Sequence, residues 1–184
     1  MFKQLKQMPM MALFCAVFFV VSPNVYAGSA EELEIDVDAT IERFNQRIQG
    51  GREFLGRAEG VLVFPNIVKA GLIIGGEYGE GALRVNGQTV AYYNTAAASL
   101  GLQAGGQTSS LIIVFMNDQA LRNFRASDGW EVGVDGSVAV MDEGVGGSID
   151  TTSIQDPIIA FAFGNKGLML NLSLEGSKYT RIAK

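Results

Sequence analysis

The chain has 184 residues, 48% of them apolar, and a formal net charge of −5. This length fits one domain with a single sizeable core, and the apolar fraction excludes a disordered chain. The absence of histidine excludes histidine-based nucleophile systems, histidine zinc sites and histidine proton shuttles. The acidic balance argues against nucleic acid as a partner, because phosphate binding requires a basic surface.

The first 27 residues have the pattern of a signal peptide. Lys3 and Lys6 precede an apolar run over residues 10–21, which is shorter than the roughly 20 residues that a spanning helix needs. Residues 25–27 place small side chains at the −3 and −1 positions, so we expect cleavage after residue 27, with an uncleaved anchor as the alternative. The single cysteine, Cys15, would be lost and the net charge would become −7. We therefore expect an exported, periplasmic protein, at most peripheral on an envelope membrane.

The next part of the chain has a helical pattern. Residues 28–37 are acidic without a clear period, and we expect a flexible acidic lead-in. Asp38 can cap a helix that begins at residue 39. This helix has an apolar stripe that faces either the core or a membrane, formed by Ile41, Phe44 and Ile48. The glycine pair 50–51 should interrupt it, and a second helical piece is expected over residues 52–58.

After these helical pieces the pattern becomes that of strands. Apolar or alternating runs predict strands over residues 60–65, 68–74, 82–85, 88–93, 111–116, 130–140, 158–163 and 168–175. The Asn-Gly pair at 86–87 predicts a tight hairpin, because both central residues need a positive φ. Asn117 or Asp118 should cap a short helix that buries Leu121 and Phe124.

These elements predict an α+β domain with an amino-terminal helical segment and a short central helix. Its β-rich antiparallel sheet should be curved or closed into a partial barrel, since many of the 23 glycines lie inside strand-like segments. The glycine-rich run 75–81 lacks the spacing and the lysine of a nucleotide-binding loop, so we expect a bend between strands and no cofactor.

Two acidic pairs are candidates for acid–base chemistry or for a hard cation such as calcium: Glu77 with Glu80, and Asp142 with Glu143. A solvated acidic loop explains each pair more simply, because no calcium-loop pattern surrounds them. We expect no catalytic residue, no metal site and no enzyme activity.

Basic residues are the candidates for lipid contacts. One group follows the helical segment and the other lies in the domain: Arg43, Arg47, Arg52 and Arg57, and Lys69, Lys166, Lys178 and Arg181. Each basic residue near an anionic membrane contributes about 1 kcal/mol to binding. A solvated charged face is the alternative interpretation of either group.

Five ordered segments resemble the SYLF domain family: residues 58–83, 92–116, 129–140, 150–169 and 175–182. Gly60 with Phe64-Pro65, the Lys69-Ala70-Gly71 step and Gly129-Trp130 are similar to its recurrent signatures. The resemblance covers residues 39–182, so we assign residues 38–184 to this domain.

The resemblance implies a binding domain. Eukaryotic SYLF proteins bind phosphoinositides and other membrane lipids, and some fungal ones bind and bundle actin. Bacterial members resemble this chain, with a signal peptide followed by the domain alone. In relatives of this family, a basic amino-terminal stretch contacts lipid. The corresponding stretch of this chain begins with acidic residues: Glu31, Glu32, Glu34, Asp36 and Asp38.

We therefore expect a non-enzymatic module that binds anionic phospholipid or a membrane surface of the bacterial cell envelope. The alternative is a periplasmic structural or protein-interaction domain without a lipid ligand. Its strand edges would then serve self-association or another envelope protein. Actin is not expected as a partner, because an exported bacterial protein would not meet it.

Overall fold

The computed structural model describes residues 29–71, 74–100, 107–141, 155–164, 167–168 and 174–184. Its elements follow one another in the order α1 (Ala30–Arg47), α2 (Gly51–Gly56), β1 (Gly60–Gly71), β2 (Ile74–Val85), β3 (Gln88–Leu100), β4 (Gln107–Phe115), α3 (Asp118–Ala126), β5 (Trp130–Glu131), β6 (Ala139–Met141), β7 (Ile158–Gly164), β8 (Gly167–Leu168) and β9 (Lys178–Ile182).

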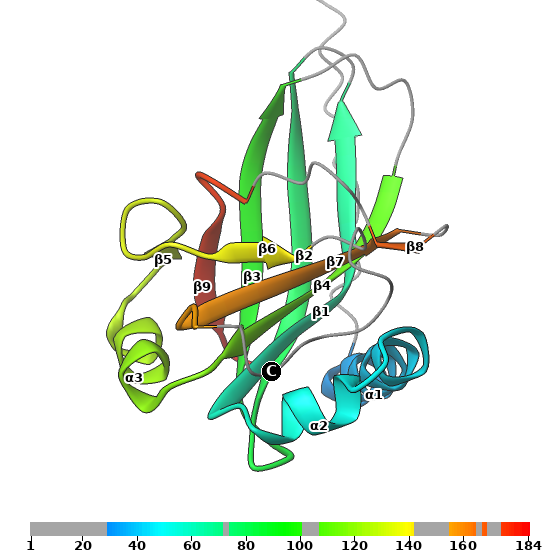
Figure 1. The fold of residues 1–184 in the computed structure, drawn as a ribbon. Coiled ribbons are helices and arrows are strands. Elements are labelled where there is room, and N and C mark those ends of the chain that lie inside the picture. The colour runs from blue at the N-terminus through cyan, green and yellow to red at the C-terminus, as the bar shows by residue number, and fades with distance from the viewer. Residues whose placement is uncertain (1–28, 72–73, 101–106, 142–154, 165–166, 169–173) are drawn as a thin grey trace, which may run out of the picture.

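The strands form one curled sheet that resembles half a barrel (Figure 1). Its order is β5-β9-β3-β2-β1-β4-β7-β6, with β8 paired to β7. The pairs are antiparallel apart from β6 with β7. The predicted α+β class, with a curved antiparallel sheet and helices at the amino terminus and in the centre, is confirmed.

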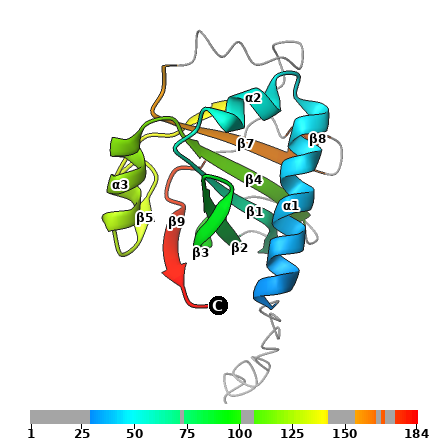
Figure 2. The ribbon, with the colours of Figure 1, turned by 90° about the horizontal axis from the view of Figure 1, so that it is seen from below.

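Each face of the sheet carries its own apolar layer, and Figure 2 shows α1 and α3 on opposite sides of the strands. The layer beneath α1 and α2 includes Phe44, Phe54, Val63, Ile112 and Phe161. The layer beneath α3 includes Leu62, Phe64, Phe115, Phe124, Trp130 and Tyr179. Strand β7 contributes alternate residues to both layers, which explains why its sequence is apolar at every position.

Helix α1 begins at Ala30, so the prediction of a flexible lead-in is wrong for residues 30–37. The Ser29 hydroxyl accepts a hydrogen bond from the Glu32 backbone N–H at 3.1 Å, and the Ser29 N–H donates to the Glu32 carboxylate at 2.9 Å. This capping box satisfies backbone groups that a helix end leaves unpaired. Leu33 and Val37 then bury against the sheet and extend the apolar stripe.

The stripe predicted from the sequence faces the core. Phe44 is fully buried and packs edge-on against Phe161 and Phe163, with ring centroids 4.9 and 5.8 Å away. Ile48 is buried as well, and Ile41 packs against the same layer. The alternative in which this stripe meets a membrane is therefore wrong.

The sequence predicted a strand that ends at Pro65. In the structure β1 instead continues through Pro65 to Gly71. The pairing of β1 with β2 shifts between Val63 and Asn66, and a matching shift occurs towards β4. Proline has no N–H to offer a neighbouring strand, so a bulge is one of the few places it can occupy inside a sheet. The Ser110 hydroxyl donates to the Pro65 carbonyl at 2.6 Å and closes the bulge.

The glycine-rich run 75–81 lies inside β2 and is not the bend that the sequence predicted. A Cβ atom at Gly81 would lie 2.4 Å from the Val63 carbonyl oxygen, and one at Gly79 would lie 2.9 Å from the Asn66 carbonyl oxygen. These glycines let the bulged backbone of β1 approach β2 closely.

Several local predictions are confirmed. Asn86 and Gly87 join β2 to β3 with φ values of 51° and 77°. Asn117 caps α3 by accepting a hydrogen bond from the Ala120 N–H at 2.8 Å, and the inner residues of α3 are buried. Gly50, with φ of 81°, separates α1 from α2.

One strand prediction is wrong, and another falls mostly outside the described residues. The segment 130–140 is not one strand, because β5 ends after two residues and Gly133, with φ of 87°, turns the chain and leaves Val134 exposed. In the alternating segment predicted over 168–175, residues 169–173 lie outside the described part of the chain.

Replacing Gly81 with alanine should destabilise the fold, because the new methyl group must displace the backbone of β1. We expect the free energy of unfolding to fall by about 2 to 3 kcal/mol in urea titrations. Gly76→Ala is the matched control, since its nearest neighbour would lie 3.9 Å away. Equal effects of the two substitutions would contradict the close approach at the bulge.

Burial raises the pKa of Tyr179, so the folded protein keeps the phenolic proton above pH 10, where the unfolded chain has lost it. Stability should therefore fall as the pH rises above about 10. Tyr179→Phe should reduce this loss, and burial of Tyr93 accounts for part of the remainder. At neutral pH the substitution should cost little, because the hydroxyl has no hydrogen-bond partner among the described residues. Thermal melts across this pH range would measure both effects.

Candidate functional site

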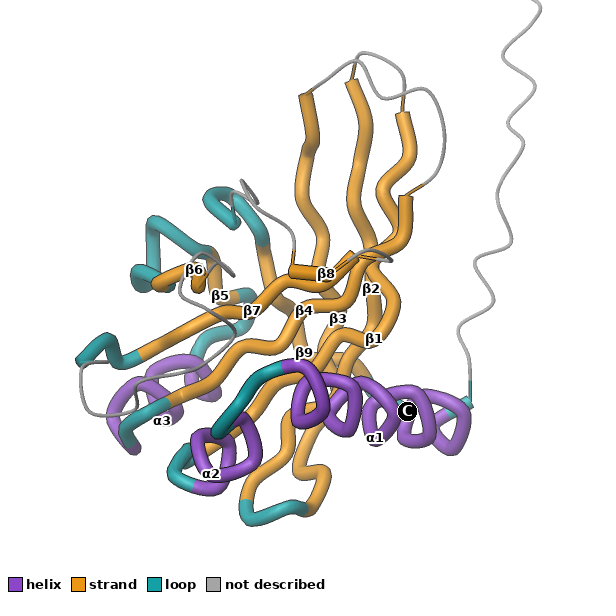
Figure 3. The backbone as a smooth tube through the Cα atoms, turned by 45° about the vertical axis from the view of Figure 1, so that its right-hand side comes forward, coloured by secondary structure: helices purple, strands orange, loops and turns teal. Residues whose placement is uncertain are grey.

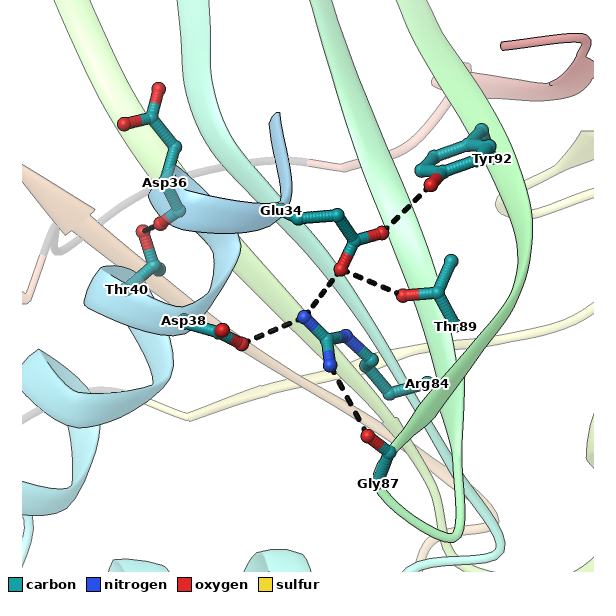
Figure 4. Close-up of polar contacts among 8 residues, drawn as sticks. All are labelled: Glu34, Asp36, Asp38, Thr40, Arg84, Gly87, Thr89 and Tyr92. Atoms are coloured by element: carbon teal, nitrogen blue, oxygen red, sulfur yellow. Dashed lines mark hydrogen bonds and ion pairs between the residues drawn. The ribbon is translucent and has the colours of Figure 1, made fainter. Parts of the chain in front are cut away.

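Arg84 of β2 holds the amino-terminal half of α1 against the sheet (Figure 4). Its guanidinium lies 2.6 Å from a carboxylate oxygen of Glu34 and 2.7 Å from one of Asp38. It also donates to the Gly87 carbonyl at 3.2 Å, which ties the hairpin turn to the same group. The exposed fractions of the Arg84 and Glu34 side chains are 16% and 28%, so this pair is largely removed from water.

The Glu34 carboxylate accepts two further hydrogen bonds, both from side chains of β3. The Thr89 hydroxyl donates to one carboxylate oxygen at 3.0 Å, and the Tyr92 hydroxyl donates to the other at 2.9 Å. The bond to Glu34 raises the pKa of Tyr92, because only the neutral phenol can donate it. Glu34 therefore links α1 to both strands of the hairpin.

The position of α1 sets the position of α2. The two helices join at Gly50, and Gly51 packs so closely that a Cβ there would lie 2.8 Å from the Phe44 ring. Phe54 is fully buried, with its ring centroid 5.7 Å from that of Phe161. With Phe54 turned inward, Arg52 of α2 and Arg57, which follows the last residue of α2, are exposed.

Four of the predicted lipid contacts are exposed on α1, on α2 and at the residue after α2, and we call them together the arginine surface: Arg43, Arg47, Arg52 and Arg57. Arg52 pairs with Glu42 at 3.3 Å, but both side chains are exposed and such a pair is weak. Arg43 lies 3.4 Å from the Ser110 hydroxyl. None of the ion pairs found in the described part of the chain involves Arg43, Arg47 or Arg57.

A cavity of about 420 Å³ lies beside the arginine surface, between α1, α2 and the hairpin turn. Its apolar lining comes from Ile41, Leu55, Ala58 and Val61, and its polar lining includes Asn45, Arg52 and Arg84. The Asn45 Oδ1 and Arg84 Nε atoms are buried and have no hydrogen-bond partner among the described residues. The cavity thus combines an apolar wall with polar atoms that can still form hydrogen bonds.

The other predicted lipid contacts that the structure describes lie on β1 and β9. Lys69 pairs with Glu77 across β1 and β2 at 2.6 Å. Lys178 and Arg181 lie on β9, which β3 and β2 separate from β1. Lys166 lies outside the described residues. The four arginines thus follow one another along α1 and α2, whereas Lys69 and the basic residues of β9 lie on separate strands of the sheet.

The acidic pairs do not form a catalytic or cation site where they are described. Glu77 and Glu80 stand on opposite faces of β2, because their positions differ in parity. Glu77 pairs with Lys69, and Glu80 pairs with Lys184 at 2.6 Å. Asp142 and Glu143 lie outside the described residues. The described residues contain no group of three or more potential metal ligands that could hold a metal ion.

Sequence reasoning missed Arg84, the residue on which α1 depends. The one available signal is a single charge in the apolar strand 82–85, and its partners lie 46 and 50 positions away. Such separations are set by the fold. Among the helices that the structure describes, none has the length and apolar character needed to cross a membrane.

Part of the chain matches a protein-family model. Residues 96–183, from the second half of β3 to just past the end of β9, match the family model described as "Ysc84: Las17-binding protein actin regulator". No curated protein matches the chain. The matched region contains α3 and β9, whereas Arg84 and the arginine surface precede it.

Replacing Arg84 with methionine should leave the Glu34 carboxylate largely buried without a cation. We expect the free energy of unfolding to fall by about 2 to 3 kcal/mol, since removing one partner of a buried pair is costly. Asp38→Asn is the control, because that side chain is 67% exposed and its ion pair should contribute less than about 1 kcal/mol. Equal losses in urea titrations would show that Arg84 does not select Glu34 as its main partner.

Proposed function

Because residues 96–183 belong to the Ysc84 (SYLF) family, we propose that this protein is a non-enzymatic module that binds anionic phospholipid at a membrane surface of the bacterial cell envelope. The match confirms the family predicted from the sequence. The family consists of binding domains, so membership supports, in broad terms, a binding domain related to lipid or actin. The signal-peptide pattern of residues 1–27 supports an exported protein.

The arginine surface is the observation that carries this proposal. Guanidinium groups bind phosphate oxygens through two parallel hydrogen bonds, which suits them to phospholipid headgroups. Three of the four arginines are outside every ion pair found in the described residues, and the fourth has a weak, exposed partner. The neighbouring cavity offers an apolar wall of Ile41, Leu55, Ala58 and Val61 to the part of the lipid below its headgroup.

The expected affinity is low. Four arginines at about 1 kcal/mol each give about 4 kcal/mol, which corresponds to a dissociation constant of about 1 mM. The net charge of −5 works against attraction of the whole molecule, so binding depends on the local surface. Such binding is peripheral, reversible and weakened by salt.

Flotation of the purified protein with vesicles tests the proposal. We expect binding to phosphatidylglycerol vesicles at low salt, less binding at high salt, and little binding to phosphatidylcholine vesicles. Arg47→Glu with Arg52→Glu should reduce binding by about tenfold or more. Lys178→Glu with Arg181→Glu changes the net charge equally on β9 and should have a smaller effect.

Three outcomes would contradict the proposal. Equal losses in the two double variants would show that overall charge, and not the arginine surface, controls binding. Salt-resistant binding to both vesicle types would indicate apolar insertion. No binding of the unmodified protein to either vesicle would exclude the lipid function.

A further inference from the structure

Three exposed apolar side chains lie together in one groove beside the amino-terminal half of α1. Ile35, Val68 and Tyr78 are 63%, 49% and 36% exposed, and all three line a groove of about 470 Å³. Leu33 and Pro65 extend its apolar wall. Single exposed apolar residues are ordinary on protein surfaces, but a cluster in a concave site marks a binding surface.

The groove exists because the sheet continues past α1. Beyond the bulge at Pro65, β1 and β2 extend above the helix, as Figure 3 shows. Val68 pairs with Tyr78 on one side and with Thr108 on the other, so these side chains form a row on one face of the sheet. Helix α1 forms the other wall of the groove through Ile35.

The rim of the groove is acidic. Glu32, Asp36 and Glu80 line it, and no cation forms an ion pair with Glu32 or Asp36 within the described residues. The Asp36 carboxylate accepts a hydrogen bond from the uncharged Asn66 amide at 3.0 Å. Two carboxylates beside an apolar wall therefore lack a positive partner, and this charge would repel an anionic lipid.

Glu80, on the rim of the groove, already forms an ion pair with a lysine of this chain. Its carboxylate lies 2.6 Å from the Lys184 ammonium, and the Lys184 side chain is 6% exposed, so its aliphatic stem is covered as well. The other Glu80 oxygen accepts a hydrogen bond from the Tyr78 hydroxyl at 3.0 Å. A carboxylate and an aromatic ring together suit an ammonium or guanidinium group on an apolar stem.

We propose that this groove binds a short peptide segment of a partner protein in which Lys or Arg residues stand beside apolar residues. The apolar side chains of the segment cover Val68, Tyr78 and Ile35, and its cations pair with Glu32 and Asp36. This site is independent of the proposed lipid function, because it uses none of the arginines and has the opposite charge.

Fluorescence anisotropy with three labelled peptides of equal length tests this proposal. We expect saturable binding of an alternating Lys-Leu peptide, and binding at least about tenfold weaker for Lys-Ser and Glu-Leu peptides. Asp36→Asn with Val68→Ser should weaken Lys-Leu binding by about tenfold or more. Glu53→Gln with Val90→Ser is the matched control, since it removes an exposed acid and an exposed valine elsewhere.

Ile35→Ser provides a second test on the other wall, at an exposed helix position where folding should be unaffected. It should weaken Lys-Leu binding as well, with unchanged urea unfolding. Equal binding to the groove and control variants, equal binding of the Lys-Leu and Glu-Leu peptides, or no saturable binding would overturn the proposal. Light scattering without peptide provides a further check. A dimer that Ile35→Ser abolishes would also overturn the proposal, because a second copy of the chain would then fill the groove.

Discussion

The ion pairs of Arg84 with Glu34 and Asp38 determine where α1 lies on the sheet, and both proposed binding surfaces depend on that position. Apolar packing of the Phe44 stripe has no preferred direction, so it would tolerate small shifts of the helix. A guanidinium paired with carboxylates is directional, and the Arg84–Glu34 pair is mostly shielded from water. This contact therefore selects one position of α1, from which α2 and its arginines follow.

The bulge at Pro65 provides the second constraint. It changes the course of β1, and Gly79 and Gly81 allow β2 to follow closely. Beyond the bulge, β1 and β2 therefore extend past α1, and α1 does not cover one face of this part of the sheet. The same local irregularity that accommodates a proline inside a sheet also creates one wall of the acidic groove.

Helix α1 separates the two surfaces by charge. Its first turn carries Glu31 and Glu32, and its last turn carries Arg47. This distribution stabilises the helix, because acids favour its amino end and bases its carboxyl end. It also places an acidic groove at one end and the arginine surface at the other. A lipid headgroup and a cationic peptide would therefore be drawn to different ends of one helix.

The sequence alone determined the features that depend on neighbouring residues. The Asn86-Gly87 hairpin, the Asn117 cap, the apolar stripe of α1 and the curved antiparallel class all follow from local chemistry. The capping box at Ser29 was equally readable, but the acidic run after it concealed the start of the helix. Only the tertiary structure decided that Pro65 lies within a strand, that the 75–81 glycines lie inside β2, and that Arg84 meets Glu34. Strand register and ion pairing join residues far apart in the chain, and no local preference specifies them.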